Sequence, residues 1–457
     1  MKWILIGAFA IFIPNTLNAF TTPPDSTNTL VEKGTAQYLI SEGKRLYNEN
    51  NFKLAIIKFR EALTKDKDNP VATYWIGECH YSLGNYEEAK DQVEKALTLK
   101  PDVHEQSSNL LGQAYHRLGE LDKAIGHYNT ALGVLSKQKA KELQIQFHLD
   151  EVNRAKEMMG SPVDVKIKNL SVSVNSAAQE YSAVLSPSGK ELYFISRRAD
   201  NKGGGTSGGD QGYFEDIYVC LWDEAKGDWG PADNGDVLIE RLNTYGFDGI
   251  SQISADGQYL YLTINTMSLE KTQRKPKTAH SDLFVSKINK EGNWNTPKPI
   301  GKPVNSFAFE AASCVSGDGK VMYFISERPG GKGGSDVWYS YKVGKNWSKP
   351  VNMGEVVNTA GQETTVWTNQ DGKTVWFSST GHEGMGGYDI YVTHKKDGRW
   401  TKPANLGYPI NTVSDETHFK YYPEKNVAYY ATFSSKSNKG MGSRDIFEID
   451  MTNYKMP

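Results

Sequence analysis

Cysteine is scarce in this chain of 457 residues, which has three. Cys79 falls in a predicted helix, whereas Cys220 and Cys314 fall in different predicted strands, and none belongs to a C-x-x-C arrangement. One disulfide is possible in an oxidising compartment, but an odd count without a spacing signature favours buried free thiols. Histidine pairs with an intervening Glu at metal-ligand spacing are also missing, so the sequence predicts neither a metal site nor a cofactor.

The chain has little excess charge of either sign, since 52 Lys and Arg stand against 54 Asp and Glu. This balance excludes the global basic field that nucleic acids or anionic membranes require, so no nucleic-acid partner is predicted.

Long apolar runs are missing after the amino terminus. The run Trp3–Ile13 is too short to span a bilayer comfortably, and it follows Lys2 and precedes the small residue Ala19. Residues 1–19 are therefore predicted to be a secretory signal peptide, with an uncleaved anchor as the alternative. We expect an exported, periplasmic protein that has no direct membrane span.

What the sequence does have is repetition, first over residues 35–159. Ala55, Ala89 and Ala124 each lie twelve residues after a Gly and seven before another Ala. These small residues let antiparallel helices approach closely, and Gly84 and Gly119 permit the turns between them. The pattern resembles the tetratricopeptide repeat, which implies three helical pairs followed by a capping helix.

In the tetratricopeptide family, one face of the first helix of each pair lines a groove. The resemblance places seven side chains there, where an extended peptide or another protein would bind: Lys44, Tyr47, Tyr74, Glu78, Tyr81, Gln113 and His116. The alternative is that these side chains pack on the second half of the chain, because interfaces within one chain are common.

A second repeat occupies residues 160–457. Asn is followed by Ser or Thr, three further residues and an acid, in five copies: Asn175–Glu180, Asn243–Asp248, Asn305–Glu310, Asn358–Glu363 and Asn411–Glu416. Each copy divides into four strands, and a tight turn joins the first two. Together with the helical repeats, this period predicts an α-solenoid followed by a five-bladed β-propeller, with residues 20–34 as a flexible linker after the signal peptide.

The propeller is predicted to be closed by its own amino-terminal segment. The fifth copy lacks the outer-strand Trp of the other four, whereas residues 169–175 parallel residues 352–358 and 405–411. The segment before the first copy should therefore supply the outer strand of the last blade and leave no open sheet edge.

The five repeated acids begin the innermost strands and are expected to ring one mouth of the central channel: Glu180, Asp248, Glu310, Glu363 and Glu416. Such a ring could bind a cation or the tip of a basic peptide. Alternatively, each acid accepts hydrogen bonds from the Asn-Ser/Thr turn of the neighbouring blade and fixes the register between blades, which the strict spacing favours.

One segment, Gly205–Gly209, matches the G-x-S-x-G pattern of hydrolases. A nucleophile elbow needs a strand before the serine and a helix after it, but this segment lies in a glycine-rich loop ahead of another strand. No catalytic residue is predicted.

The best-matching propeller segments are Ser186–Lys190 with Tyr193–Ser196, and Ser316–Lys320 with Tyr323–Ser326. They resemble the WD-like, Pro-Asp-type repeat of TolB-related propellers. An exported tetratricopeptide array followed by this propeller is similar to PorE-type components of the type IX secretion and gliding machinery of Bacteroidota. Those components also carry an OmpA-like peptidoglycan-binding domain, for which this sequence has no counterpart, so we expect any outer-membrane association to run through a partner.

The resemblance implies a non-enzymatic periplasmic scaffold that binds other outer-membrane or periplasmic proteins. Two alternatives stay open. A propeller hydrolase or lyase would bring an acid–base pair or metal ligands together from different blades. A carbohydrate- or peptide-binding module of an uptake system would expose aromatic side chains at the channel mouth.

Overall fold

The computed structural model describes residues 26–206, 212–265, 281–433 and 440–457. The predicted signal peptide lies outside this part of the chain, and so does the serine of the G-x-S-x-G segment. Helix α1 begins at Ser26, so the second half of the predicted flexible linker is helical instead.

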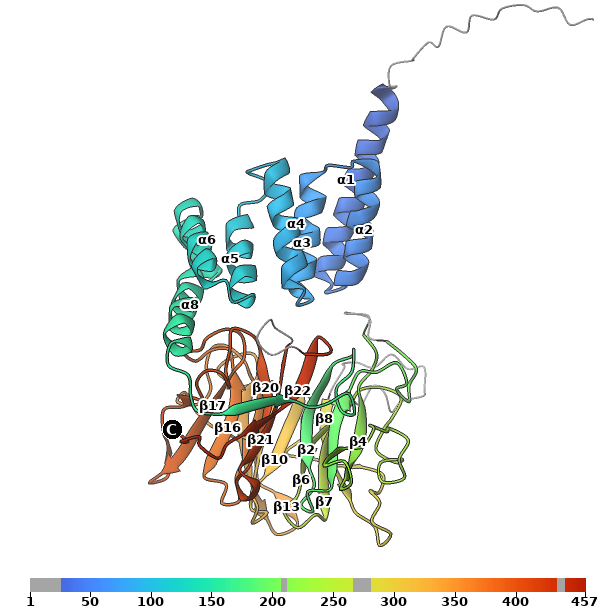
Figure 1. Cartoon of the computed structure of the whole chain (residues 1–457), viewed down its shortest axis with the longest axis vertical. Helices are drawn as coiled ribbons and strands as arrows, with labels where there is room; N and C mark the ends of the chain where they lie inside the picture. The colour runs from blue at the N-terminus through green and yellow to red at the C-terminus, as the bar shows by residue number, and fades with distance from the viewer. Residues whose placement is uncertain (1–25, 207–211, 266–280, 434–439) are drawn as a thin grey trace, which may run out of the picture.

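Eight α-helices stand in the amino-terminal part of the described chain (Figure 1): α1 Ser26–Asn48, α2 Phe52–Lys65, α3 Pro70–Ser82, α4 Tyr86–Leu99, α5 Ser107–Arg117, α6 Leu121–Val134, α7 Lys137–Glu142 and α8 Ile145–Met159. The first six form the three predicted pairs, and α8 packs on α6 as the cap. Small residues allow the close approach, because a Cβ at Gly43 would lie 2.5 Å from the Phe59 ring and one at Gly112 would lie 2.7 Å from Tyr128.

The rest of the chain forms five sheets, which are the five blades of a propeller. From the inside outward they contain β2 Glu180–Leu185, β3 Glu191–Ser196, β4 Asp216–Asp223 and β5 Asp228–Trp229; β6 Asp248–Ile253, β7 Tyr259–Asn265, β8 Ser281–Lys287 and β9 Lys298–Pro299; β10 Glu310–Val315, β11 Val321–Ser326, β12 Asp336–Val343, β13 Asn346–Trp347 and β14 Val351–Asn352; β15 Glu363–Thr368, β16 Thr374–Ser379, β17 Asp389–Lys396, β18 Arg399–Trp400 and β19 Ala404–Asn405; and β20 Glu416–Tyr422, β21 Val427–Phe433, β22 Arg444–Asp450 and β1 Lys166–Asn169.

The predicted closure is confirmed. Strand β1 pairs antiparallel with β22, so that Lys166 lies opposite Asp450 and Asn169 opposite Phe447. Figure 1 shows β1 crossing from the helical part to lie beside β22. Because the innermost strands also contact one another around the whole ring, the inner strands form a closed circle.

The outer strand of the fourth blade is divided. The structure has two short strands here, β18 and β19, and likewise β13 and β14 in the preceding blade. Pro350 and Pro403 stand between the two halves, and proline has no N–H to donate to a sheet ladder.

Candidate functional site

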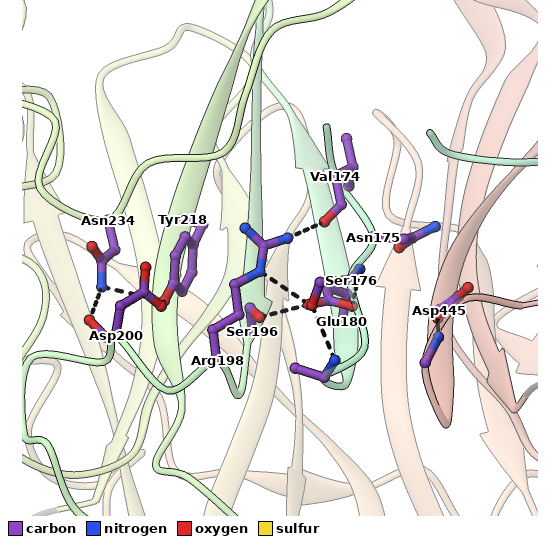
Figure 2. A network of polar contacts seen from close by, with 12 residues as sticks. Val174, Asn175, Ser176, Glu180, Ser196, Arg198, Asp200, Tyr218, Asn234 and Asp445 are labelled. Carbon is purple, nitrogen blue, oxygen red and sulfur yellow. Dashed lines mark hydrogen bonds and ion pairs between the residues drawn. The ribbon is translucent and has the colours of Figure 1, made fainter. Parts of the chain in front are cut away.

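The five repeated acids begin the five inner strands, as predicted, and their carboxylates are fully buried. Glu180 shows the contacts of the first copy (Figure 2). It accepts hydrogen bonds from the backbone N–H of Ser176 at 3.0 Å, from the Ser176 hydroxyl at 2.6 Å and from the Ser196 hydroxyl at 2.7 Å. Arg198 adds an ion pair at 3.3 Å. The Ser or Thr four residues earlier makes the same two bonds in every copy.

The Asn that opens each motif binds the preceding blade. Asn243 accepts from the backbone N–H of Ile217 at 2.8 Å and donates to the carbonyl of the same residue at 2.9 Å. The other four Asn residues bind the third strand of the blade before them in the same way. The motif therefore joins two blades, with the Asn on one and the acid on the next.

This geometry corrects the expectation that the acids ring a channel mouth. The cavity at the centre of the propeller is lined by the residues beside them on the inner strands, and none of the five acids lines it. Their hydroxyl and backbone partners come from the turn that enters the same blade and, in four of the five copies, also from its second strand, and not from a neighbouring blade. A cation or basic peptide in the channel would not reach these buried carboxylates.

Burial shapes the ionisation of these acids. It raises the pKa of Asp248 to about 8, although the hydrogen bonds from Thr244 act to lower that pKa. Burial likewise raises the pKa of Glu363 and of Glu416 to about 7. The second blade has Ile264 where the other four carry a hydroxyl on the second strand, so Asp248 has one donor fewer.

The predicted groove residues separate into two groups. Around the first two repeats, Glu78 accepts hydrogen bonds from the hydroxyls of Tyr74 and Tyr47, the latter at 3.4 Å. The Lys44 ammonium lies 5.1 Å from the centre of the Trp75 ring. Lys44, Tyr47, Trp75 and Glu78 are half-buried, and we call these four the groove cluster.

The prediction that Tyr74 lines the groove is wrong, because Tyr74 is fully buried and offers no surface to a partner. Its ring stacks on His104 with centres 4.4 Å apart, and its hydroxyl holds Glu78 in place. Gln113 lies half-buried on α5.

The third repeat meets the propeller, as the alternative reading foresaw. His116 is buried, and its Nε2 donates to the carbonyl of Met385 at 2.7 Å. Burial, followed by the charge of Arg117, lowers the pKa of His116 to about 3, so the ring is neutral at neutral pH. Tyr81, on α3 of the second repeat, packs beside Tyr86 and near Arg117.

Charged groups complete this contact. Arg117 forms an ion pair with Asp415 at 3.1 Å and donates to the carbonyl of Val413 at 3.2 Å. Arg154 on α8 donates to the carbonyl of Gly384 at 3.1 Å. Burial alone would raise the pKa of Asp415, but Arg117 and Arg444 outweigh it and hold that pKa below its usual range. No period of either repeat selects Arg117, Arg154 or Asp415, so these residues could not be predicted from the repeats.

Three further features lie on or near the face of the propeller that meets the helices. A cleft of about 720 Å³ separates the α1–α2 and α3–α4 turns from the first and fifth blades, and Lys53, Asn85, Arg198 and Tyr213 are among its lining residues. The central channel holds a cavity of about 450 Å³. In the turns that enter the second and third blades, Tyr245 and Phe307 are 56% and 70% exposed, but neither lines the central cavity.

Among the described residues, no group of three or more His, Cys, Asp or Glu side chains is arranged to hold a metal ion. The three cysteines are buried and unpaired. No helix in the described ranges combines the length and hydrophobicity that a membrane crossing requires.

Comparisons with known proteins concern the helical part. The family model described as anaphase-promoting complex, cyclosome, subunit 3 matches residues 48–131. No curated protein matches the chain.

Several solved structures are similar to it. The type III secretion chaperone SycD of Yersinia enterocolitica, in complex with a peptide of the translocator YopD, is 18% identical, with 27% of this chain and 95% of that chain covered and a TM-score of 0.25. The second TPR domain of human RPAP3, in complex with an HSP70 peptide, is 18% identical over 27% of this chain and 98% of that chain, with a TM-score of 0.24. The Sgt2 TPR domain of Aspergillus fumigatus is 21% identical over 28% of this chain and 86% of that chain, with a TM-score of 0.24.

The chain thus contains tetratricopeptide-type repeats followed by a five-bladed propeller. Both folds are commonly interaction modules, which suggests a protein–protein interaction scaffold and is consistent with a non-enzymatic role.

Proposed function

We propose that this chain is a non-enzymatic periplasmic scaffold that binds envelope proteins, as a component of the type IX secretion or gliding machinery. Its groove cluster on the first two repeats is the partner-binding surface. The location rests on the signal-like residues 1–19, and the pathway rests on the resemblance of the two modules.

The proposed binding surface is supported by the different contacts of the predicted groove residues. His116 and Arg117 of the third repeat are bound to the propeller, whereas the partners of Lys44, Tyr47 and Glu78 all lie within the helical part. The third repeat therefore fixes the groove on the propeller while the first two leave half-buried aromatic and charged side chains for another chain. Aromatic side chains with an adjacent charge are typical of the residues that dominate protein interfaces.

The test is affinity purification of the tagged full-length chain from its native envelope, followed by quantitative mass spectrometry. Lys44→Glu reverses a charge in the groove cluster, and Lys95→Glu makes the same change on the exposed face of α4. We expect Lys44→Glu to reduce recovery of the main partner by about ten-fold or more, the effect of losing one good interface contact. Lys95→Glu should leave recovery unchanged.

Equal recovery with both variants would contradict the groove as the binding surface. The same preparation tests the location: the mature chain should begin at Phe20, after the predicted cut. A chain that keeps Met1 and stays in the cytoplasmic fraction would refute the periplasmic part and leave the groove test intact.

A further inference from the structure

The central cavity of the propeller contains a buried lysine. Lys420 on β20 lines this cavity and is 4% exposed. Its ammonium donates to the Ser182 hydroxyl at 2.9 Å, and that hydroxyl in turn donates to the carbonyl of Ile250 at 2.5 Å. An amine that is removed from water without a counter-charge is costly, so a lysine at such a place needs an explanation.

The repeat makes this lysine stand out. Four residues after the acid, the other copies carry Val184, Gln252, Cys314 and Trp367. The fold therefore accepts an apolar or neutral side chain at this position. Lys420 is not needed to build the blade.

The described surroundings of Lys420 supply no counter-charge. It forms no ion pair with any residue that the structure describes, whereas Glu180 and Glu310 are paired with Arg198 and Arg328. Burial holds the pKa of Lys420 well below its ordinary value, with the Cys314 thiol acting in the opposite direction. Burial, then Lys420 and Arg444, likewise lower the pKa of His418, which lines the same cavity.

One carboxylate does line the cavity, near its mouth. Glu215 accepts a hydrogen bond from the Tyr181 hydroxyl. The cavity thus combines an amine with hydroxyls from Ser182 and Thr365 on its wall.

The remaining wall is mixed, because it holds further polar residues, among them Ser251, Thr263 and Asn265, beside an apolar part. Phe247 and Phe309, which immediately precede the inner-strand acids of the second and third blades, line the cavity on the side where these strands begin. Phe309 is 37% exposed, so the aromatic surface is open to solvent at this mouth. A cavity of about 450 Å³ lies in the range of small-molecule sites, and such sites pair an apolar lining with a few polar groups.

We propose that the central channel binds an amphipathic carboxylate, with Lys420 as the group that recognises the carboxylate and Phe247 and Phe309 as contacts for the apolar part. The ligand supplies the counter-charge that the described chain does not. Its source is either a small organic acid or the carboxy-terminal residue of a peptide. This site is separate from the groove cluster and does not depend on the scaffold proposal.

The experiment is calorimetric titration of the full-length chain with two pairs of probes. One pair is 4-phenylbutyrate and its neutral amide, and the other is the tripeptide Gly-Gly-Phe with a free or an amidated carboxy terminus. We expect the wild-type chain to bind at least one acid about ten-fold or more tightly than its amide, because hydrogen bonds to charged groups are the stronger ones. Tighter binding of phenylbutyrate indicates a small acid as the ligand, and tighter binding of the tripeptide indicates a peptide terminus.

Lys420→Met and Lys420→Gln should both lose this preference for the acid. Gln252 shows that glutamine fits the equivalent position, and a thermal melt no lower than that of the wild-type chain would show that either variant is folded. Lys320→Met, on an exposed turn, should leave binding unchanged. Equal affinity of the wild-type chain for acid and amide in both pairs, including no binding of either, would overturn the proposal, and so would a preference that survives in folded Lys420 variants.

Discussion

Single hydrogen-bonding groups of the repeated motif join the blades of the propeller. The Asn binds the backbone of one blade, and the acid at the start of the next blade accepts from the adjacent Ser or Thr. Two of the acids, Glu180 and Glu310, also pair with an arginine, whereas Glu363 is held by hydroxyl and backbone donors. The acids should therefore contribute different amounts to the free energy of unfolding.

Replacing Glu310 with Gln should therefore cost more stability than replacing Glu363. Glu310→Gln leaves Arg328, whose side chain is 10% exposed, without its counter-charge, and we expect a loss of about 3 kcal/mol in the free energy of unfolding. Glu363→Gln keeps one accepting oxygen and should cost about 1 kcal/mol. Urea titration of the propeller transition measures both, and the exposed Glu424→Gln is the control. Equal losses from the two variants would show that the arginine pair contributes nothing.

The repeat spacing predicted that these acids begin the inner strands, because residues that recur at a strict interval occupy equivalent positions in each blade. It did not predict which side of the inner strand each acid occupies. A side chain at the first residue of a strand can turn toward the channel or back toward its own turn, and donors at Ser176 or Thr359 decide this only once the chain is folded. Lys420, in contrast, is visible in an alignment of the five copies.

Among the elements, strand β1 is the one that closes the ring. Its residue Asn169 donates to Asp445 at 2.8 Å, and Asn175 donates to Asn169 at 3.0 Å, which reproduces the contacts of Asn352 and Asn358 in the third blade. The outer edge of the last blade is thus completed by a segment far away in the sequence. The parallel between segments predicted this pairing, whereas proline at positions 350 and 403 explains why the outer strands of the third and fourth blades are divided.

Replacing residues 166–174 by an equally long Gly-Ser segment should lower the melting temperature of the propeller sharply. The blade would lose its outer strand and expose an edge, and a loss of several kcal/mol corresponds to a shift of about 10 °C or more. Val172→Ser, at a position 77% exposed in the same segment, is the control and should melt like the wild-type chain. A melting temperature that stays unchanged in the Gly-Ser variant would refute closure by β1.

At the scale of the whole molecule, the third tetratricopeptide repeat and the capping helix α8 hold the propeller. The contact uses Arg117, His116 and Arg154 on the helices and the loops around Met385 and Asp415 on the propeller. Packing there is tight, because a Cβ at Gly387 would lie 2.4 Å from the Arg117 guanidinium. Repeat periods describe contacts within each module, so this contact between modules could not be predicted from them.

Arg117→Gln should uncouple the two modules. It removes the ion-pair partner of Asp415 in a largely buried site and leaves only the charge of Arg444 nearby, so we expect a loss of about 3 kcal/mol in the free energy of unfolding and a larger radius of gyration in small-angle scattering. Arg45→Gln removes two ion pairs, with Glu42 and Glu49, whose arginine is 53% exposed, and its effect should stay below about 1 kcal/mol. If the Arg117 variant keeps the wild-type radius and melts as the wild-type chain does, the ion pair does not hold the modules together.

The central claim is that the first two repeats bind a partner while the third binds the chain's own propeller. Photo-crosslinking in the native host, with a photoreactive residue placed at Tyr47 or at His116 of the full chain, tests it most directly. The Tyr47 position should crosslink to another envelope protein, and the His116 position should crosslink only within the chain. A Tyr47 position that yields no intermolecular product, or a His116 position that captures the partner, would contradict the account.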